Sequence, residues 1–176
     1  TWVHEGGTVV AIGSSARWAS RAFLELSVPS NGADAGSDLT WAEREAQQDD
    51  RRIPGALLTA TVDTTHPLAG GHRTTVAFHV FDRRALPVDD AGHVVARFAA
   101  KDARIGGVIS EANLAGLSGS PAVTHHEVEG GTVVCFASDP TNRGMNLAGM
   151  ELLMRCTLLS PSMSDALQPL GAHEHD

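Results

Sequence analysis

An unbroken run of apolar residues near the start of the chain predicts a strand that is buried on both faces. Residues 8–12 read Thr-Val-Val-Ala-Ile between a Gly-Gly pair and a further glycine. Such runs are typical of parallel sheets that are covered by helices on both sides. Residues 1–5 have the pattern of the last turns of a helix, and residues 14–26 repeat apolar side chains at helical spacing, with Ser14 or Ser15 available as N-cap. The opening therefore predicts a helix end, a central parallel strand and a second helix.

The rest of the chain alternates short apolar segments with turns and ends in one amphipathic helix. Patterns typical of strands occur at residues 55–62, 74–80, 93–98 and 105–109, and a short helix is expected near residues 111–115. Residues 122–128 and 132–137 flank Glu129-Gly130-Gly131, which predicts an antiparallel hairpin. Residues 145–159 carry apolar side chains at helical spacing. This order predicts an α/β domain, with a sheet covered by helices on both faces and a terminal antiparallel hairpin.

One domain is expected over residues 1–159. Within it, residues 27–52 begin with a small, polar, breaker-rich stretch and continue with alternating charge and a weak apolar face, so we expect a mobile surface excursion. Almost no apolar side chain in this stretch can offset the cost of fixing the backbone. Residues 160–176 end in His-Glu-His-Asp and are expected to form a flexible tail.

Composition excludes several classes of partner. Of the 176 residues 42% are hydrophobic, and no apolar run approaches the ~20 residues that span a bilayer, so we expect a soluble chain and no membrane segment. Lys and Arg number 13 against 21 Asp and Glu, a net charge of -8. This balance repels phosphate backbones, so nucleic acid is not an expected partner. The two cysteines, Cys135 and Cys156, lie in apolar segments and are expected to be buried free thiols.

Nine histidines invite a search for a metal site, but their spacing argues against one. Zinc needs three or four converging ligands, usually including a short-spaced pair. His125 and His126 are adjacent in a predicted strand and so point to opposite faces, and His173 and His175 lie in the predicted tail. His126 and Glu129 match the letters of the H-x-x-E ligand pair of carboxypeptidase-type enzymes, but a strand places positions i and i+3 on opposite faces. We predict no metal site and no cofactor in this chain.

No candidate nucleophile has the setting that catalysis requires. The run Gly116-Leu-Ser118-Gly-Ser120 misses the G-x-S-x-G pattern at its last residue and does not sit between a buried strand and a helix. Cys135 is placed in mid-strand, whereas a reactive thiolate is favoured at a sharp strand-to-helix turn. The sequence therefore predicts no catalytic constellation.

Two loops lie where open α/β sheets bind ligands, at the carboxyl ends of strands. One is Gly13-Ser14-Ser15, and the chemically richer one is Ser138-Asp-Pro-Thr-Asn-Arg-Gly144. Asp139 could accept from helix N–H groups or from a ligand hydroxyl, and Arg143 could bind a carboxylate. Asp139 and Arg143 are therefore the candidate ligand-binding residues. The alternative is that Asp139 caps the following helix and that Arg143 pairs with Asp139 or with solvent.

The order of several segments resembles a known family. The resemblance is carried by GGTVVAIGSSA, then IPGALL with THPLAGG, then GSPAVTHHEVEGGTVVCFASDPTNRGMNLAGMELLM. These segments are similar to the class I glutamine-amidotransferase-like domain attached C-terminally to large bacterial zinc carboxypeptidases, and the similarity extends over residues 1–159. In that family the stretch like Thr65-His66-Pro67-Leu68-Ala69 follows the strand after the Pro-Gly step. The stretch like residues 139–144 joins the last strand to the last helix.

The resemblance implies a flavodoxin-like three-layer domain that has lost amidotransferase chemistry. Family members are typically exported, which implies a secreted or periplasmic location. Zinc and the catalytic Glu belong there to a separate upstream peptidase domain, and none of those residues has a matching position here. The implied role is a non-catalytic accessory domain of a zinc metallopeptidase. The trimerisation domains of certain bacterial β-galactosidases share the G-G-x-V-V strand, and they give the alternative of a degenerate ligand-binding or oligomerisation module of a glycoside hydrolase.

Two classes of function therefore compete at this point. In the first, the chain docks on a hydrolase or helps it to associate; in the second, it is a small ligand-binding or hydrolytic domain that uses the loop of Asp139 and Arg143. In the related architecture at least one further strand and helix precede residues 8–12. We therefore expect an open strand edge or an uncovered apolar patch, and self-association of the chain.

Overall fold

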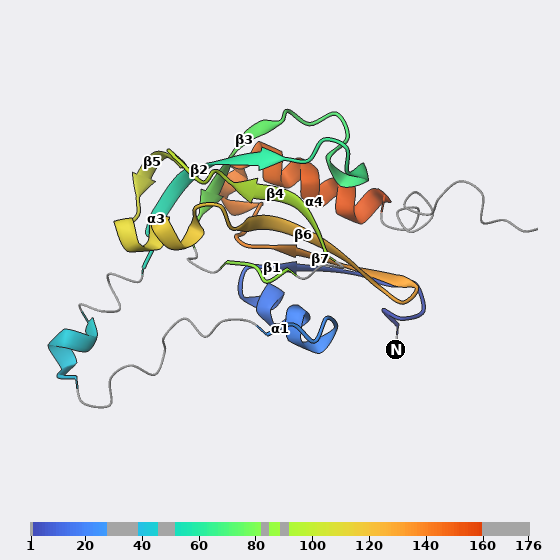
Figure 1. The fold of residues 1–176 in the computed structure, drawn as a ribbon, viewed down its shortest axis with the longest axis horizontal. Coiled ribbons are helices and arrows are strands. Elements are labelled where there is room, and N and C mark those ends of the chain that lie inside the picture. Colours follow the sequence, from blue (N-terminus) through green and yellow to red (C-terminus); the bar gives the residue numbers. More distant parts are fainter. Residues whose placement is uncertain (1, 28–38, 46–51, 82–84, 89–91, 160–176) are drawn as a thin grey trace, which may run out of the picture.

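Figure 1 shows a mixed sheet with helices packed against it, in a computed structural model that describes residues 2–27, 39–45, 52–81, 85–88 and 92–159. The described strands are β1 (Thr8–Ile12), β2 (Gly55–Val62), β3 (Thr75–Val80), β4 (His93–Phe98), β5 (Arg104–Val108), β6 (Pro121–Val128) and β7 (Gly131–Phe136). The helices with described ends are α1 (Ser14–Ala22), α3 (Glu111–Leu117) and α4 (Leu147–Leu159), with 3₁₀ turns η1 (Pro67–Ala69) and η2 (Asn142–Gly144); residues 41–45 are also helical. The predicted tail and most of the predicted excursion lie outside the described residues.

The described sheet has its parallel pair at one edge. The strand order is β1-β7-β6-β4-β2-β3, and β5 also pairs with β2. β1 runs parallel to β7, from Thr8 opposite Thr132 to Ile12 opposite Phe136. The other ladders between described strands are antiparallel. The α/β class predicted from the sequence is therefore confirmed, in the form of a mixed sheet.

The sheet curls around α4. This helix contacts both β1 and β3, which stand at opposite ends of the strand order. Its residues Gly149, Leu152 and Cys156 are buried, whereas α1 packs on the other side of β1 and β7 (Figure 1). Helices therefore cover both faces of the sheet next to β1. Within the described ranges, no helix has the length and apolar character needed to cross a membrane.

The predicted hairpin is confirmed and anchors the start of the chain. β6 and β7 are joined by a turn at Glu129 and Gly130, with Val128 opposite Gly131. At Gly131 the backbone of the N-terminal turn passes so closely that an added Cβ would lie 1.8 Å from the carbonyl oxygen of Val3. Only glycine allows this approach. The hairpin and residues 2–7 therefore form one packed unit.

Two predictions about the opening of the chain are wrong. Residues 2–6 form turns instead of a helix end, closed by the N–H of Gly6 on the carbonyl of Val3 (3.1 Å) and by the N–H of Gly7 on that of Trp2 (3.0 Å). β1 is parallel, as predicted, but it is not central in the described sheet: it stands at an open edge, which was also expected, and Ala11 is its one buried residue. Its apolar run reflects the cover of α1 and α4 on its two faces, which does not require a strand on each side.

Candidate functional site

The predicted ligand loop leads from β7 into α4 and is held by its own turn. Asp139 is exposed, and its Oδ1 accepts hydrogen bonds from the N–H (2.8 Å) and the hydroxyl (2.7 Å) of Thr141. The Nδ2 of Asn142 lies 3.3 Å from Nδ1 of His79 on β3. Arg143 is exposed and adopts a left-handed φ of 53°. No ion pair in the described part of the chain joins Asp139 to Arg143.

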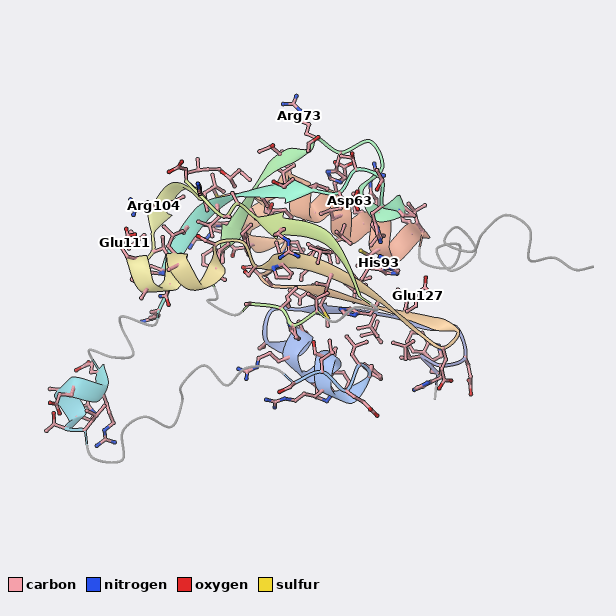
Figure 2. The ribbon with its side chains drawn as sticks, in the orientation of Figure 1. Asp63, Arg73, His93, Arg104, Glu111 and Glu127 are labelled. Atoms are coloured by element: carbon pink, nitrogen blue, oxygen red, sulfur yellow. The ribbon has the colours of Figure 1, made fainter. Side chains whose placement is uncertain are left out.

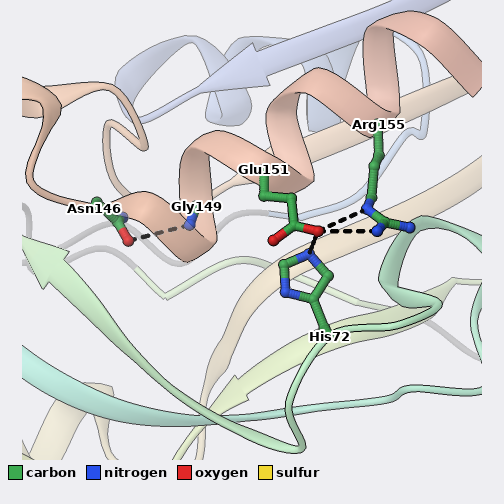
Figure 3. Close-up of polar contacts among 5 residues, drawn as sticks. All are labelled: His72, Asn146, Gly149, Glu151 and Arg155. Atoms are coloured by element: carbon green, nitrogen blue, oxygen red, sulfur yellow. Dashed lines mark hydrogen bonds and ion pairs between the residues drawn. The ribbon is translucent and has the colours of Figure 1, made fainter.

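The alternative interpretation of this loop, in which Asp139 caps the last helix, is wrong. Asn146 is the N-cap of α4, because its Oδ1 accepts a hydrogen bond from the N–H of Gly149 at 3.1 Å (Figure 3). The turn at Thr141 and the 3₁₀ turn η2 separate Asp139 from the helix. Asn is among the preferred N-cap residues, so the position of Asn146 directly before the apolar repeat could have revealed this cap.

Two substitutions in this loop distinguish a ligand-binding role from a purely structural one. If Arg143 binds a carboxylate, Arg143→Ala should abolish binding of a peptide C-terminus and change stability by less than about 1 kcal/mol, since the side chain is exposed. Asp139→Ala should cost about 1 kcal/mol, because it removes both hydrogen bonds of the turn. Calorimetric titration and thermal unfolding measure the two effects. A destabilising Arg143→Ala without any ligand would make Arg143 a structural residue.

The other predicted loop, at Gly13-Ser14-Ser15, leaves a helix N-terminus without a side-chain cap. The hydroxyl oxygen of Ser15 accepts from the N–H of Ile12 and donates to its carbonyl, both at 2.9 Å. Gly13 is the N-cap of α1 and makes no side-chain hydrogen bond, and the first turn contains no acidic residue. The first N–H groups of α1 therefore carry a partial positive charge that no side chain of this turn offsets.

The side chains considered as nucleophiles lie in unreactive positions, where they contribute to packing or to a helix end. Cys135 and Cys156 are buried and free, as predicted. Burial raises the pKa of the Cys135 thiol to about 11 and that of Cys156 to about 12, which disfavours the reactive thiolate. The hydroxyl of Ser118 donates to the carbonyl of Leu114 at the end of α3. Ser118 therefore closes a helix instead of occupying a strand-to-helix turn.

Three histidines, distant in the sequence, gather on the sheet. The pairing of β4 with β6 places His93 opposite His125, and His66, which precedes η1, brings its Nε2 to 3.4 Å from Nδ1 of His125. His66 and His125 are buried, whereas His93 is exposed. His93 and Asp63 lie at the same end of the sheet (Figure 2). The sequence analysis missed this cluster because only the strand register brings its members together.

Hydrogen bonds assign the protons of this cluster and argue against a metal. The N–H of Leu68 donates to Nδ1 of His66 at 3.2 Å, so the proton of neutral His66 is on Nε2, which faces His125. A histidine that binds a metal through Nε2 carries its proton on Nδ1 instead. Among the described residues no group of three or more ligand side chains is placed to hold a metal ion.

Burial keeps His66 and His125, the two buried members of the cluster, uncharged near neutral pH. Burial, followed by the charges of His66, His93 and His126, lowers the pKa of His125 to about 3. Burial also lowers the pKa of His66, an effect that His93 increases and Asp63 partly offsets. The buried pair His66 and His125 is therefore neutral at pH 7 and acts as a packed part of the core.

The two residues of the H-x-x-E match lie in different environments. The ring of His126 is buried and lies so close to Gly92 that a Cβ there would meet it at 2.4 Å. Glu129 lies in the hairpin turn, where its Oε1 is 3.0 Å from Nδ1 of His4. The match therefore does not correspond to a pair of converging side chains.

A cavity and an unpaired strand edge lie where β1 meets α4 in the described chain. No described strand pairs with the outer edge of β1. A cavity of about 420 Å³ borders this edge, and it is lined by Trp2, Glu5, Gly6, Gly7, Thr8, Val10, Cys156 and Thr157. These residues come from the N-terminal turn, from β1 and from the C-terminal half of α4. A partner at this edge would therefore meet both polar backbone and apolar side chains.

Three large apolar side chains are exposed on the outer face of α4. Leu147, Met154 and Leu158 are 74%, 59% and 72% exposed, and their spacing forms a stripe on one face of the helix, in which the charged Glu151 also lies. The helix itself is held firmly. Glu151 accepts from Arg155 at 2.9 Å and lies 3.6 Å from Nε2 of His72 on the loop that follows η1 (Figure 3). We call this stripe, together with the edge of β1 and the adjoining cavity, the association surface.

Comparisons with known proteins concern the fold. No protein-family model matches the chain, and no curated protein does. A solved structure of a cytoplasmic protein from Salmonella typhimurium matches with a TM-score of 0.51 and 17% identity, over 88% of this chain and 55% of that one. The chain thus spans about half the length of this neighbour. At this identity the match supports a shared fold and carries no information about activity.

Two further structures match with lower scores. A cytoplasmic protein from Salmonella typhimurium LT2 has a TM-score of 0.43 and 15% identity, over 93% of this chain and 57% of that one. A β-galactosidase from Bacillus circulans sp. alkalophilus has a TM-score of 0.47 and 14% identity, over 96% of this chain and 20% of that one.

Proposed function

We propose that the chain is a non-catalytic accessory module that works by association, carried by a larger hydrolase of the zinc carboxypeptidase type that its sequence resembles. The carrying observation is the association surface. Leu147, Met154 and Leu158 are exposed on the outer face of α4, no described strand pairs with the outer edge of β1, and α4 also lines the cavity beside that edge. Exposed apolar side chains that gather on a folded chain are typical of interaction sites.

The settings of the chemically capable residues support association over catalysis. Both thiols are buried with raised pKa values, and Ser118 closes a helix. The buried pair of histidines, His66 and His125, is a neutral part of the core. The association surface instead exposes backbone groups of β1 and apolar side chains of α4. Such groups are suited to binding another polypeptide.

We also propose a three-layer, flavodoxin-like arrangement for the complete unit. Support comes from the parallel pairing of β1 with β7 and from α1 and α4, which lie on opposite sides of these strands. The outer face of α4 would then be covered by the hydrolase. The partner implied by the sequence resemblance is the upstream peptidase domain.

The isolated chain should neither release C-terminal residues from peptides nor retain stoichiometric zinc after dialysis. The reason is that His126 and Glu129 do not converge and that the proton on Nε2 of His66 faces His125. A peptidase assay and metal analysis measure both. Stoichiometric zinc lost in a His126→Gln variant would contradict this expectation.

Binding to the hydrolase is tested with a matched pair of variants. The polypeptide encoded upstream of Thr1, expressed separately, should bind the chain, and Met154→Lys on α4 should weaken binding at least about tenfold by placing a charge in an apolar contact. Ile105→Lys is the control, because Ile105 is similarly exposed, at 54%, but lies on β5. An upstream polypeptide without a carboxypeptidase-like domain, or equal effects of the two variants, would contradict the proposal.

A further inference from the structure

We propose that the edge of β1 pairs with β1 of a second copy of this chain, antiparallel and across a two-fold axis at Val9. The inference rests on the proposed function, because it uses the same association surface, and it names the partner of one part of that surface. It follows from which backbone groups of β1 are free, from the one register that uses all of them, and from the charges that this register brings together.

The backbone groups that face the open edge are those of the even-numbered residues. The carbonyl of Gly7 accepts from the N–H of Thr132, and the N–H of Gly13 donates to the carbonyl of Phe136. Because the direction of these groups alternates along a strand, odd-numbered residues face β7. The N–H and C=O groups of Thr8, Val10 and Ile12 therefore face outward.

Ile12 is already satisfied and cannot join a ladder at this edge. The side chain of Ser15 bonds both its N–H and its C=O at 2.9 Å. At the other end of the strand, the N–H of Gly6 donates to the carbonyl of Val3. Within the part of the chain that the structure describes, the groups left for a partner strand are the N–H and C=O of Thr8 and of Val10.

One antiparallel register uses all of these groups. With Val9 on the two-fold axis, Thr8 lies opposite Val10 of the second copy, and Val10 lies opposite Thr8. Each of these pairs exchanges two hydrogen bonds, as residues in the hydrogen-bonded positions of an antiparallel ladder do. An axis at Val10 would need the N–H and C=O of Ile12, and an axis at Thr8 would need the N–H of Gly6; these groups are bonded within the chain.

The same register is complementary in charge. Counted back from Thr8 in this register, Glu5, which is exposed and lies in the turn before β1, comes towards Gly13 of the second copy, at the start of α1. That helix N-terminus lacks a side-chain cap and an acidic residue in its first turn, and a carboxylate is stabilising at such a position. The two-fold axis creates this contact twice. β1 itself carries no charge and no proline, the devices that usually protect an edge strand from pairing.

The cavity beside β1 also fits a second copy. Thr8 and Val10 line it, and the side chains of paired residues on neighbouring strands lie on the same face of the sheet. Val10 and Thr8 of the second copy would therefore extend the apolar wall on the open side of the cavity. A two-fold pairing of identical edges is an isologous interface, the commonest kind among soluble oligomers.

Sedimentation of the full chain over a range of concentrations measures the association. The wild-type chain should be a reversible dimer, and Val10→Pro should weaken the dimer at least about tenfold by removing an edge donor while the ladder with β7 stays intact. Val10→Thr is the matched control, because it keeps the N–H and the branched side chain, and it should still dimerise. Circular dichroism confirms that each variant is folded.

Cross-linking tests the register. Residues on the axis of an antiparallel pair have Cα atoms about 4.5 Å apart in the non-hydrogen-bonded position, within reach of a disulfide. Val9→Cys should therefore form a disulfide-linked dimer with oxidised glutathione as oxidant, whereas Val10→Cys and the wild-type chain, with its buried Cys135 and Cys156, should not.

The outcomes separate this inference from the proposed function. A wild-type chain that is monomeric at every concentration overturns the dimer, even if it still binds the hydrolase through α4. A dimer that tolerates Val10→Pro and does not cross-link at Val9 uses another surface and also overturns it. Loss of dimerisation in Val10→Pro together with cross-linking of Val9→Cys supports it.

Discussion

The chain should lose stability steeply as the pH falls from about 6.5 towards 4. The pKa of His125 is about 3 in the folded chain, against about 6.5 for an unperturbed histidine in the unfolded chain. Above pH 6.5 the residue is neutral in both states, so its titration costs nothing. Below that value only the unfolded chain takes up the proton. The resulting decrease in the free energy of unfolding reaches about 3 kcal/mol by about pH 4.

A variant without this titration should unfold less steeply in acid. In His125→Gln the absolute stability at pH 7 should fall, because His66 loses its acceptor, but the difference in melting temperature between pH 6.5 and pH 4.5 should shrink. His93→Gln is the control, since that histidine is exposed and ranks only third among the causes that lower the pKa of His125, after burial and His66; it should change the slope less than His125→Gln does. Thermal unfolding followed by circular dichroism measures each slope. An unchanged slope in His125→Gln would mean that another group causes the acid loss.

Gly131→Ala should be among the most destabilising single substitutions in the chain, at about 3–5 kcal/mol, the range of severe packing defects. A Cβ at this position would lie 1.8 Å from the carbonyl oxygen of Val3 and 2.5 Å from that of Gly7. Both atoms belong to the backbone, so a side-chain rotation cannot relieve the overlap. The N-terminal turn would have to move away from the hairpin. The cavity beside β1 would then lose the part of its wall that this turn forms.

Gly116→Ala is the matched control for this substitution. Gly116 lies in α3, and an added Cβ would meet nothing within 4 Å. Alanine should therefore be neutral or stabilise the helix by about 0.5–1 kcal/mol. Chemical unfolding measures both variants. A cost below about 1 kcal/mol for Gly131→Ala would show that the N-terminal turn is not packed against the hairpin in solution.

Elements with a strong local signal were predicted well from the sequence. The hairpin follows from Glu129-Gly130-Gly131 between two apolar segments, and the structure places its turn there. The helix at residues 145–159 follows from its apolar repeat and is observed as α4. Buried thiols at Cys135 and Cys156 follow from their apolar surroundings. In each case the neighbouring residues contain the information that fixes the structure.

Features set by distant parts of the chain could not be predicted in the same way. The apolar run at residues 8–12 indicates cover on both faces, but it does not say how many strands flank it, and β1 stands at the edge of the described sheet. His66, His93 and His125 meet only through strand register. The position of Asp139 at the end of β7 suggested a helix cap, yet a local turn uses its carboxylate and Asn146 caps the helix.

Amide hydrogen exchange, compared between the dissociated chain and its assembled form, tests most directly whether the chain works through its association surface. The account predicts slower exchange at Thr8 and Val10, whose N–H groups face the open edge of β1, and along α4 at residues 147–158. The predicted ligand loop, at residues 138–144, should exchange at the same rate in both forms. Slower exchange confined to that loop, with β1 and α4 unchanged, would contradict the account and make the loop of Asp139 and Arg143 the working site.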